Sequence, residues 1–163
     1  MRPVIIHSML KELVYSTIAG MDGRVFSELS RCPECGGQVK AHDTRRKRFA
    51  TVIEVGATRE IYVNVRCFYC QKCGKFLYAE DSPFYEGTRI GAPIVDFCIA
   101  NRHLPYHHVG KILEAMRIRI DRGSVRNYAL MKIPPRPSLK IYNIELPLSL
   151  VSLSELILPE HKS

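Results

Sequence analysis

The spacing of apolar residues changes period along the chain. Between residues 3 and 19 apolar side chains recur about every 3.6 residues, which predicts a helix that Pro3 begins and Gly20 ends. From Arg59 to Tyr69 apolar and polar residues alternate, which predicts a strand. One face of that strand carries Ile61, Val63, Val65, Cys67 and Tyr69. The helical period returns after residue 91.

Residues 31–80 as a whole predict a small antiparallel sheet. Short strands are expected at residues 38–42 and 49–55, and Gly56-Ala57-Thr58 has the composition of a turn before the long alternating strand. Four consecutive basic residues separate the two short strands, namely Arg45, Arg46, Lys47 and Arg48. Such a run is usually a solvated hairpin end, and contact with phosphate groups is the alternative.

Three further helices are predicted after residue 91. The first runs from Ala92 to the region of Asn101, and the second begins at Leu104-Pro105. Asp121 is a good N-cap for the third. The side chains of the third helix that should face inward are Val125, Tyr128 and Ala129.

The last thirty residues are rich in proline, leucine and serine. Three prolines in residues 133–137 end the third helix, and the leucines that follow fit either a strand or a short helix. This tail could pack back on the N-terminal helix or bind a partner protein.

Four cysteines form two nearly identical turns. Cys32 and Cys35 enclose two residues and precede a glycine, and Cys70 and Cys73 repeat this pattern. The glycine allows a positive φ, so that the backbone amides can face the sulfurs. Two such turns predict one tetrahedral four-cysteine site with a structural zinc ion. The alternative is a pair of redox disulfides or unrelated core cysteines.

The remaining two cysteines are interpreted as buried small apolar residues. Cys67 also forms a Cys-x-x-Cys pair with Cys70, but Cys73 is the one followed by glycine, as Cys35 is. Cys67 is therefore placed on the strand, and Cys98 within the helix after residue 91.

The charge is concentrated in the middle of the chain. The net charge of the 163 residues is +8, with +4 in residues 31–91 and +6 in residues 92–140. A localised basic excess indicates a polyanionic partner, most often nucleic acid, although a merely soluble basic surface is the alternative. The first twenty residues contain no signal-peptide cleavage site and no stretch is long enough to span a membrane, so a reducing cytoplasmic location is expected.

The third predicted helix carries side chains that can read DNA. Its outward residues are Arg122, Ser124, Arg126 and Asn127. Arginine pairs with guanine, asparagine with adenine, and serine with several bases. A short helix, a turn and a second helix with such a face predict a helix-turn-helix that binds double-stranded DNA. The alternative is a plain helical pair packed on the zinc sheet.

The order of these motifs resembles the N-terminal region of insertion-sequence (DDE-type) transposases of bacteria and archaea. The matching pieces are residues 32–36, 63–74 and 104–128, and the resemblance covers about residues 30–131. It implies binding to the terminal repeats of a mobile element. One departure concerns the catalytic domain of the family, which holds metals with three spaced acidic residues. Here only Glu145, Glu155 and Glu160 follow, and the 32 residues after Met131 are too short for a nuclease fold and pair no carboxylates for a two-metal site.

The sequence thus predicts an α+β fold, with a small antiparallel zinc-ribbon sheet flanked by an N-terminal helix and a C-terminal helix-turn-helix bundle. Its expected segments are residues 1–30, 31–80, 88–133 and 134–163. The expected function is DNA binding, as a truncated transposase or a transcriptional regulator. The alternative is a zinc-ribbon module that docks on a larger transcription or translation assembly. An enzyme is not expected, because no nucleophile–base pair, phosphate loop or open metal site is visible.

Overall fold

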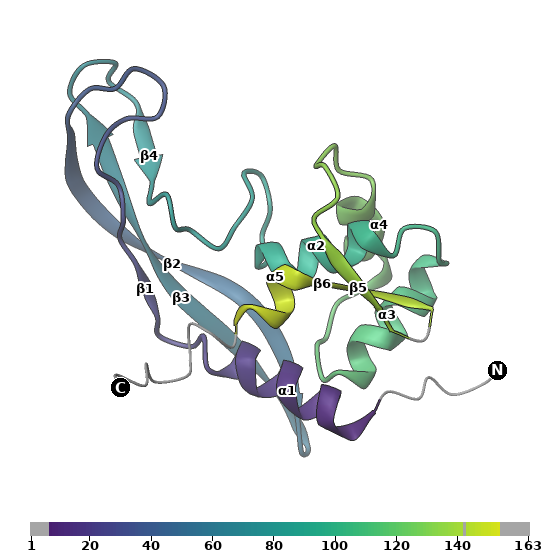
Figure 1. Cartoon of the computed structure of the whole chain (residues 1–163). Helices are drawn as coiled ribbons and strands as arrows, with labels where there is room; N and C mark the ends of the chain where they lie inside the picture. The colour runs from purple at the N-terminus through teal and green to yellow at the C-terminus, as the bar shows by residue number, and fades with distance from the viewer. Residues whose placement is uncertain (1–6, 142, 154–163) are drawn as a thin grey trace, which may run out of the picture.

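The computed structural model describes residues 7–141 and 143–153, which form a mixed α+β fold (Figure 1). Its helices are α1 Ser8–Ala19, α2 Ala92–Ala100, α3 Tyr106–Ala115, α4 Arg122–Ala129 and α5 Leu148–Val151. Its strands are β1 Val25–Phe26, β2 Val39–Glu54, β3 Ala57–Cys70, β4 Phe76–Tyr78, β5 Ser138–Ile141 and β6 Ile144–Pro147. The helices predicted before Gly20, from Ala92, from Leu104-Pro105 and after Asp121 are all present. The predicted start at Pro3 lies outside the described residues.

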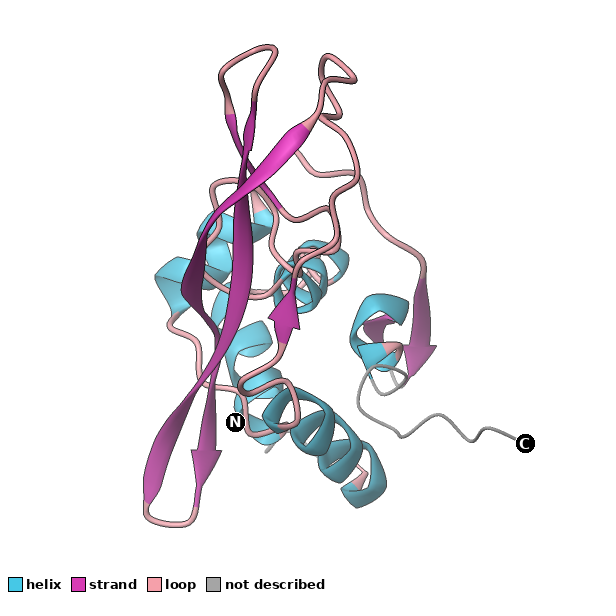
Figure 2. Ribbon diagram, turned by 90° about the vertical axis from the view of Figure 1, so that its left-hand side faces the viewer, coloured by secondary structure: helices cyan, strands magenta, loops and turns pink. Residues whose placement is uncertain are grey.

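The long β2–β3 hairpin is the main element of the larger sheet. The two strands pair antiparallel from Val39–Cys70 to Glu54–Ala57, and Gly56 turns the chain with a φ of 75°. On the other side of β3, β1 pairs in parallel and β4 antiparallel. Figure 2 shows the strong twist of this hairpin along its length.

One expectation about this sheet was wrong. The basic run Arg45–Arg48 lies in the middle of a single strand β2 and does not form a hairpin end between two short strands. The reason is that β3 is continuous opposite this run. The irregularities at His42 and Phe49 shift the register of the two strands without ending their pairing. The basic side chains are therefore held on a regular strand.

The alternation of faces predicted for β3 holds along the strand, but the pattern of burial changes at its end. Ile61, Val63, Val65 and Cys67 are buried, whereas Tyr69 is exposed and the adjacent Phe68 is buried. At this end the sheet extends away from α2–α5 (Figure 1), so none of the helices that the structure describes covers the face that carries Tyr69. Tyr69 therefore shares a face with the buried residues of β3 but is itself exposed, because the helices cover only part of the strand.

The helical part joins the hairpin through a short backbone contact. Residues 116–121 connect α3 to α4, and within them Ile118 forms a bridge with Val52 of β2. Ile118 is fully covered and belongs to the core that also contains Phe49, Ile112 and Val125. One hydrophobic cluster therefore links the hairpin, α1 and the helices.

At the start of α1, the His7 side chain caps the helix by accepting a hydrogen bond from the Met9 amide at 3.2 Å.

The C-terminal tail forms both strands and a short helix, the two alternatives that its sequence allows. β5 and β6 make a hairpin and α5 follows directly, with Leu146, Leu150 and Leu153 buried. The tail packs on α2, whose C-cap Asn101 is completely buried and bonds both the amide (2.9 Å) and the carbonyl (2.8 Å) of Glu145. These two hydrogen bonds occupy backbone groups of β6 that a neighbouring strand would otherwise bond. They attach the tail to α2.

Candidate metal centre and basic groove

The two cysteine turns have the same backbone hydrogen bonds. In the first turn, the Cys32 amide donates to the Gly37 carbonyl (3.0 Å) and the Gly36 amide to the Cys32 carbonyl (2.9 Å). In the second, Cys70 and Lys75 take the roles of Cys32 and Gly37, and Gly74 takes that of Gly36. Gly36 and Gly74 both have positive φ, at 70° and 75°, as the repeated sequence predicts.

The four cysteines converge on one point at the outer end of the β2–β3 hairpin. The sulfurs of Cys32, Cys35, Cys70 and Cys73 all lie within 4.8 Å of one another. The Cys32–Cys73 pair is separated by 3.8 Å and the Cys35–Cys70 pair by 3.4 Å, and none of the four forms a disulfide. Tetrahedral coordination with metal–sulfur bonds of about 2.3 Å places sulfurs about 3.8 Å apart. These four side chains therefore fit a metal ion.

The electrostatics of the cluster favour one thiolate and oppose a second. The Cys73 amide, 3.5 Å from the Cys70 sulfur, favours the Cys70 thiolate, and the pKa of Cys70 is lowered to about 6. The Gly37 amide favours the Cys35 thiolate as well, but the sulfur of Cys70 and burial outweigh it and raise the pKa of Cys35 to about 11. A divalent cation would relieve this repulsion, because a coordinating thiol is deprotonated by its metal.

Gly37 lets the two turns approach each other. A Cβ atom at this position would lie 2.7 Å from Cβ of Lys72 and 3.2 Å from the sulfurs of Cys35 and Cys70. The first of these distances is shorter than atoms tolerate, so a larger residue would force the turns apart. Sequence reasoning assigned no role to this second glycine.

The two other cysteines lie buried, as expected. Cys67 is on β3 outside the four-sulfur cluster, and burial raises the pKa of its thiol. Cys98 lies within α2, where burial raises its pKa to about 12. Both thiols therefore stay protonated and behave as apolar side chains.

The basic run divides between the two faces of β2. Strand pairing places Arg46 and Arg48 beside Asn64 and Tyr62, and it places Arg45 and Lys47 beside Val65 and Val63 on the other face. Side chains on each face are held by neighbours. The Arg46 guanidinium lies 3.7 Å from the centre of the Tyr62 ring, and Arg48 forms a 3.2 Å ion pair with Glu60.

Lys47 is the most enclosed of the four basic residues. Its ammonium group lies 4.5 Å from the Phe84 ring and 4.7 Å from the Tyr78 ring, and burial lowers its pKa. Arg45 forms a 3.4 Å ion pair with Asp43. Of the four, Arg48 also lines the groove beside α4.

A groove of about 340 Å³ lies where β2 meets α4. Three arginines from different segments line it, namely Arg48, Arg89 and Arg119. Ser124 and Tyr128 of α4 form the opposite wall, together with Asp121. The side chains of Arg89 and Arg119 form no ion pair within the part of the chain that the structure describes. Sequence reasoning missed both, because each is an isolated arginine in an irregular segment.

Helix α4 presents most of its predicted polar residues to solvent. Arg122, Arg126 and Asn127 are exposed, and Val125 and Ala129 are buried. Asp121 caps the helix as predicted, accepting from the Ser124 amide at 2.8 Å. The exception is Ser124, which is half-buried beside the groove and donates its hydroxyl to Asp121 at 2.8 Å. Ser124 therefore has a capping role that was not anticipated.

Comparison of the chain with protein-family models, with curated proteins and with solved structures returns no match. Within residues 7–141 and 143–153, the helices are too short or too polar to cross a membrane. The site must accordingly be interpreted from its own geometry.

Proposed function

We propose that this chain is a zinc-stabilised DNA-binding protein in which α4 reads duplex DNA. The observation that carries the proposal is that α4 both exposes polar side chains and lines a groove with three arginines. The exposed residues of the helix face are Arg122, Arg126 and Asn127, and the arginines of the groove are Arg48, Arg89 and Arg119. The proposal is that these exposed side chains and the groove contact the same duplex, because α4 also contributes Ser124 and Tyr128 to the groove.

Zinc is the metal that this proposal assigns to the four cysteines. Four thiolates near tetrahedral spacing are the ligand set of structural zinc sites. Such a set leaves no coordination position for water, so the ion would order the outer end of the sheet rather than catalyse a reaction. The proposal therefore includes one structural zinc ion and no enzymatic activity.

The helices supply the proposed reading unit. α3, the connector 116–121 and α4 would act as a helix-turn-helix with a lengthened turn, in which Arg126 contacts guanine and Asn127 contacts adenine. Arg119, Arg89 and Arg48 would bind the phosphates beside the reading helix. This arrangement suits a transposase-like protein, either a truncated transposase or a transcriptional regulator.

A tail that binds a partner protein has less support. The buried leucines of the tail, Leu146, Leu150 and Leu153, belong to the protein's own core. A docking role would have to use the exposed Leu139 and Leu148 or residues beyond 153, which lie outside the described residues.

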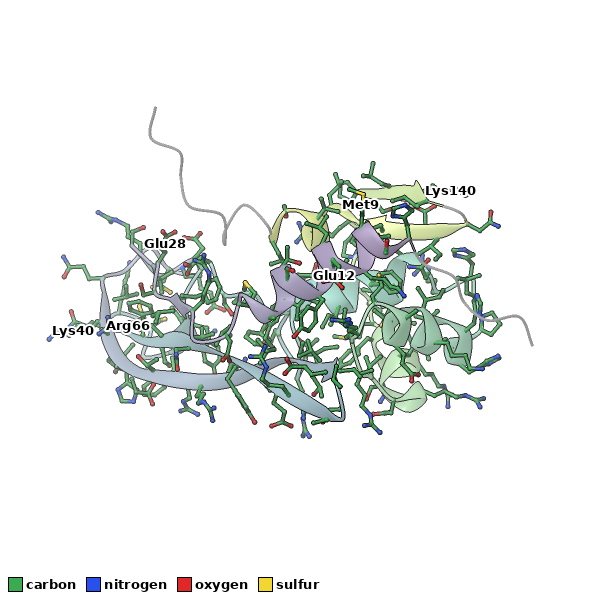
Figure 3. All side chains as sticks on the ribbon, turned by 90° about the horizontal axis from the view of Figure 1, so that it is seen from below. Met9, Glu12, Glu28, Lys40, Arg66 and Lys140 are labelled. Carbon is green, nitrogen blue, oxygen red and sulfur yellow. The ribbon has the colours of Figure 1, made fainter. Side chains whose placement is uncertain are left out.

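The experiment for the reading role is a comparison of two charge-removing variants of the full chain. Arg126→Ala should weaken binding to a selected duplex by roughly ten- to a hundredfold, because a good base contact contributes about 1–3 kcal/mol. The control is Lys140→Ala, which removes one positive charge on β5, away from α4 (Figure 3). Equal affinities for the two variants would remove α4 as the reader, provided that the zinc content is unchanged.

A further inference from the structure

Three aromatic side chains lie exposed on one face of the sheet beside the cysteine cluster. Tyr69 is 38% exposed, Phe76 59% and Tyr78 46%. Strand pairing sets Phe76 beside Tyr69 and Tyr78 beside Cys67, and positions 67 and 69 of β3 share a face. We call these three residues the aromatic face. It consists of large rings that the described residues cover only in part.

The rings of the aromatic face are held in fixed positions. The centres of the Tyr69 and Phe76 rings are 5.3 Å apart at a tilt of 53°, and the His42 ring lies 4.9 Å from Phe76. The Tyr69 hydroxyl would be 3.9 Å from a Cβ atom at Gly74, so this ring lies against the second cysteine turn. The metal centre and β4 therefore fix the rings before any ligand binds.

Basic groups surround the aromatic face. Lys40 pairs with Tyr69 across the strands, and the Lys47 ammonium lies over the Tyr78 ring. Lys40 forms no ion pair with the described residues, and Figure 3 shows it at the outer end of the hairpin. The one carboxylate that pairing places on this face within residues 40–48 is Asp43, which Arg45 neutralises. The ligand should accordingly be flat, apolar and attached to negative charge.

We propose that the aromatic face binds unpaired bases of single-stranded DNA. Every base presents a flat π-surface to an aromatic ring, while the phosphates between bases would meet Lys40, Arg45 and Lys47. Bases within a duplex already stack on one another and cannot reach these rings. Stacking is tolerant of sequence, so binding at this face has little base preference.

This site is separate from the groove beside α4. Lys40 and Arg48 are eight residues apart on β2, which corresponds to roughly 26 Å along a strand. A duplex bound at α4 and an unpaired strand bound beside the cysteine cluster would therefore lie near different parts of β2. The inference does not depend on the proposed duplex reading, because Arg126→Ala leaves the aromatic face intact.

The test uses the full zinc-loaded chain and a fluorescent oligomer of fifteen thymidines. Phe76→Leu keeps an apolar side chain but removes the ring, and it should weaken binding about tenfold or more, since stacking of one base contributes about 1–3 kcal/mol. Phe76→Tyr restores a ring and should bind within about twofold of the original chain. Met9→Ala is the control for an exposed apolar residue on α1, which Figure 3 labels on the helical side.

An abasic oligomer of the same length separates stacking from charge. It should bind weakly, and Phe76→Leu should not weaken it further. The proposal is overturned if thymidine binding is unchanged in Phe76→Leu, if the abasic oligomer binds as tightly as the thymidine oligomer, or if the original chain binds neither. Zinc content is measured for each variant. Should Phe76→Leu lose zinc, Tyr78→Leu gives the same comparison two pairs further along the strands from the four clustered cysteines.

Discussion

The backbone amide of Arg119 donates a hydrogen bond to the carbonyl oxygen of Thr51 at 2.9 Å. Two residues earlier, the carbonyl of Arg117 accepts from the amide of Ile53 at 2.8 Å. The connector between α3 and α4 is thus attached to the open edge of β2. Because Arg119 and Arg48 line the same groove, this attachment fixes the basic strand relative to α4.

Two substitutions at position 119 separate the side chain from this backbone attachment. Arg119→Ala should leave the free energy of unfolding within about 0.5 kcal/mol of the original, because the side chain is exposed and forms no ion pair with the described residues. Arg119→Pro also removes the amide donor and should cost at least about 1 kcal/mol more. Urea unfolding measures both. Equal stability of the two variants would mean that the Thr51 contact does not hold the connector.

Gly37 tests the geometry of the metal centre. Gly37→Ala places a Cβ atom 2.7 Å from Cβ of Lys72, so the two turns must separate and zinc affinity should fall by tenfold or more. Competition with a chelator measures this affinity. Gly110→Ala in α3 is the matched control, because its nearest neighbour would be 3.9 Å away and alanine favours a helix.

Cys35→Ser should have a larger effect than Gly37→Ala. A serine hydroxyl is a poor zinc ligand, so the ion should be released and residues 31–80 should lose structure. A variant with native circular dichroism and unchanged thermal stability would contradict a structural role for the metal.

Asp121 links the stability of the protein to pH. The amide of Ser124 donates to its carboxylate and lowers the pKa of Asp121 in the folded state. A lowered pKa contributes stability that is complete above the unfolded pKa of about 3.9 and is lost as pH falls through the folded value. Asp121→Ala should therefore cost about 0.5–2 kcal/mol at pH 7 and less once the pH has fallen below the folded pKa of Asp121.

Asp121→Asn is the control for this prediction, because an uncharged amide can still cap the helix. Its stability should depend less on pH below 5 than that of the original chain. Identical pH profiles for the original chain and Asp121→Asn would mean that the carboxylate charge has no part in the capping.

The two faces of β2 give a matched pair for the salt dependence of duplex binding. Arg46→Gln with Arg48→Gln removes the charges on the face of β2 that carries the groove residue Arg48, and each lost phosphate contact should flatten the slope of log K against log salt by about 0.9. Arg45→Gln with Lys47→Gln removes the same charge from the other face and should leave this slope nearly unchanged. Equal changes of the slope in the two double variants would indicate that the overall positive potential of β2, rather than specific phosphate contacts, determines the salt dependence.

Local patterns in the sequence predicted the parts of the structure that depend on neighbouring residues. The repeated Cys-x-x-Cys-Gly turn contains its own backbone geometry, and Asp121 lies directly before the helix that it caps. Parts that depend on distant partners were missed. The basic run was assigned to a hairpin end because its pairing with β3 is not visible in residues 43–48 themselves.

The same reason explains the other differences. Tyr69 follows the alternation of β3, but its exposure depends on where the helices stop covering the sheet. Asn101 and Glu145 are 44 residues apart, and neither signals the other in the sequence. Arg89 and Arg119 line one groove because the connector between α3 and α4 attaches to β2. The convergence of the four cysteines was therefore predictable, and the basic groove was not.

The most direct measurement is the zinc content of the purified full chain together with its selection from a random pool of short DNA duplexes. We expect one zinc ion per chain and an enriched sequence motif, whose recovery Arg126→Ala abolishes. A chain purified under reducing conditions without zinc would contradict the metal centre. One zinc ion per chain with no enriched sequence would contradict duplex reading by α4 and favour a zinc-ribbon module that docks on a larger assembly.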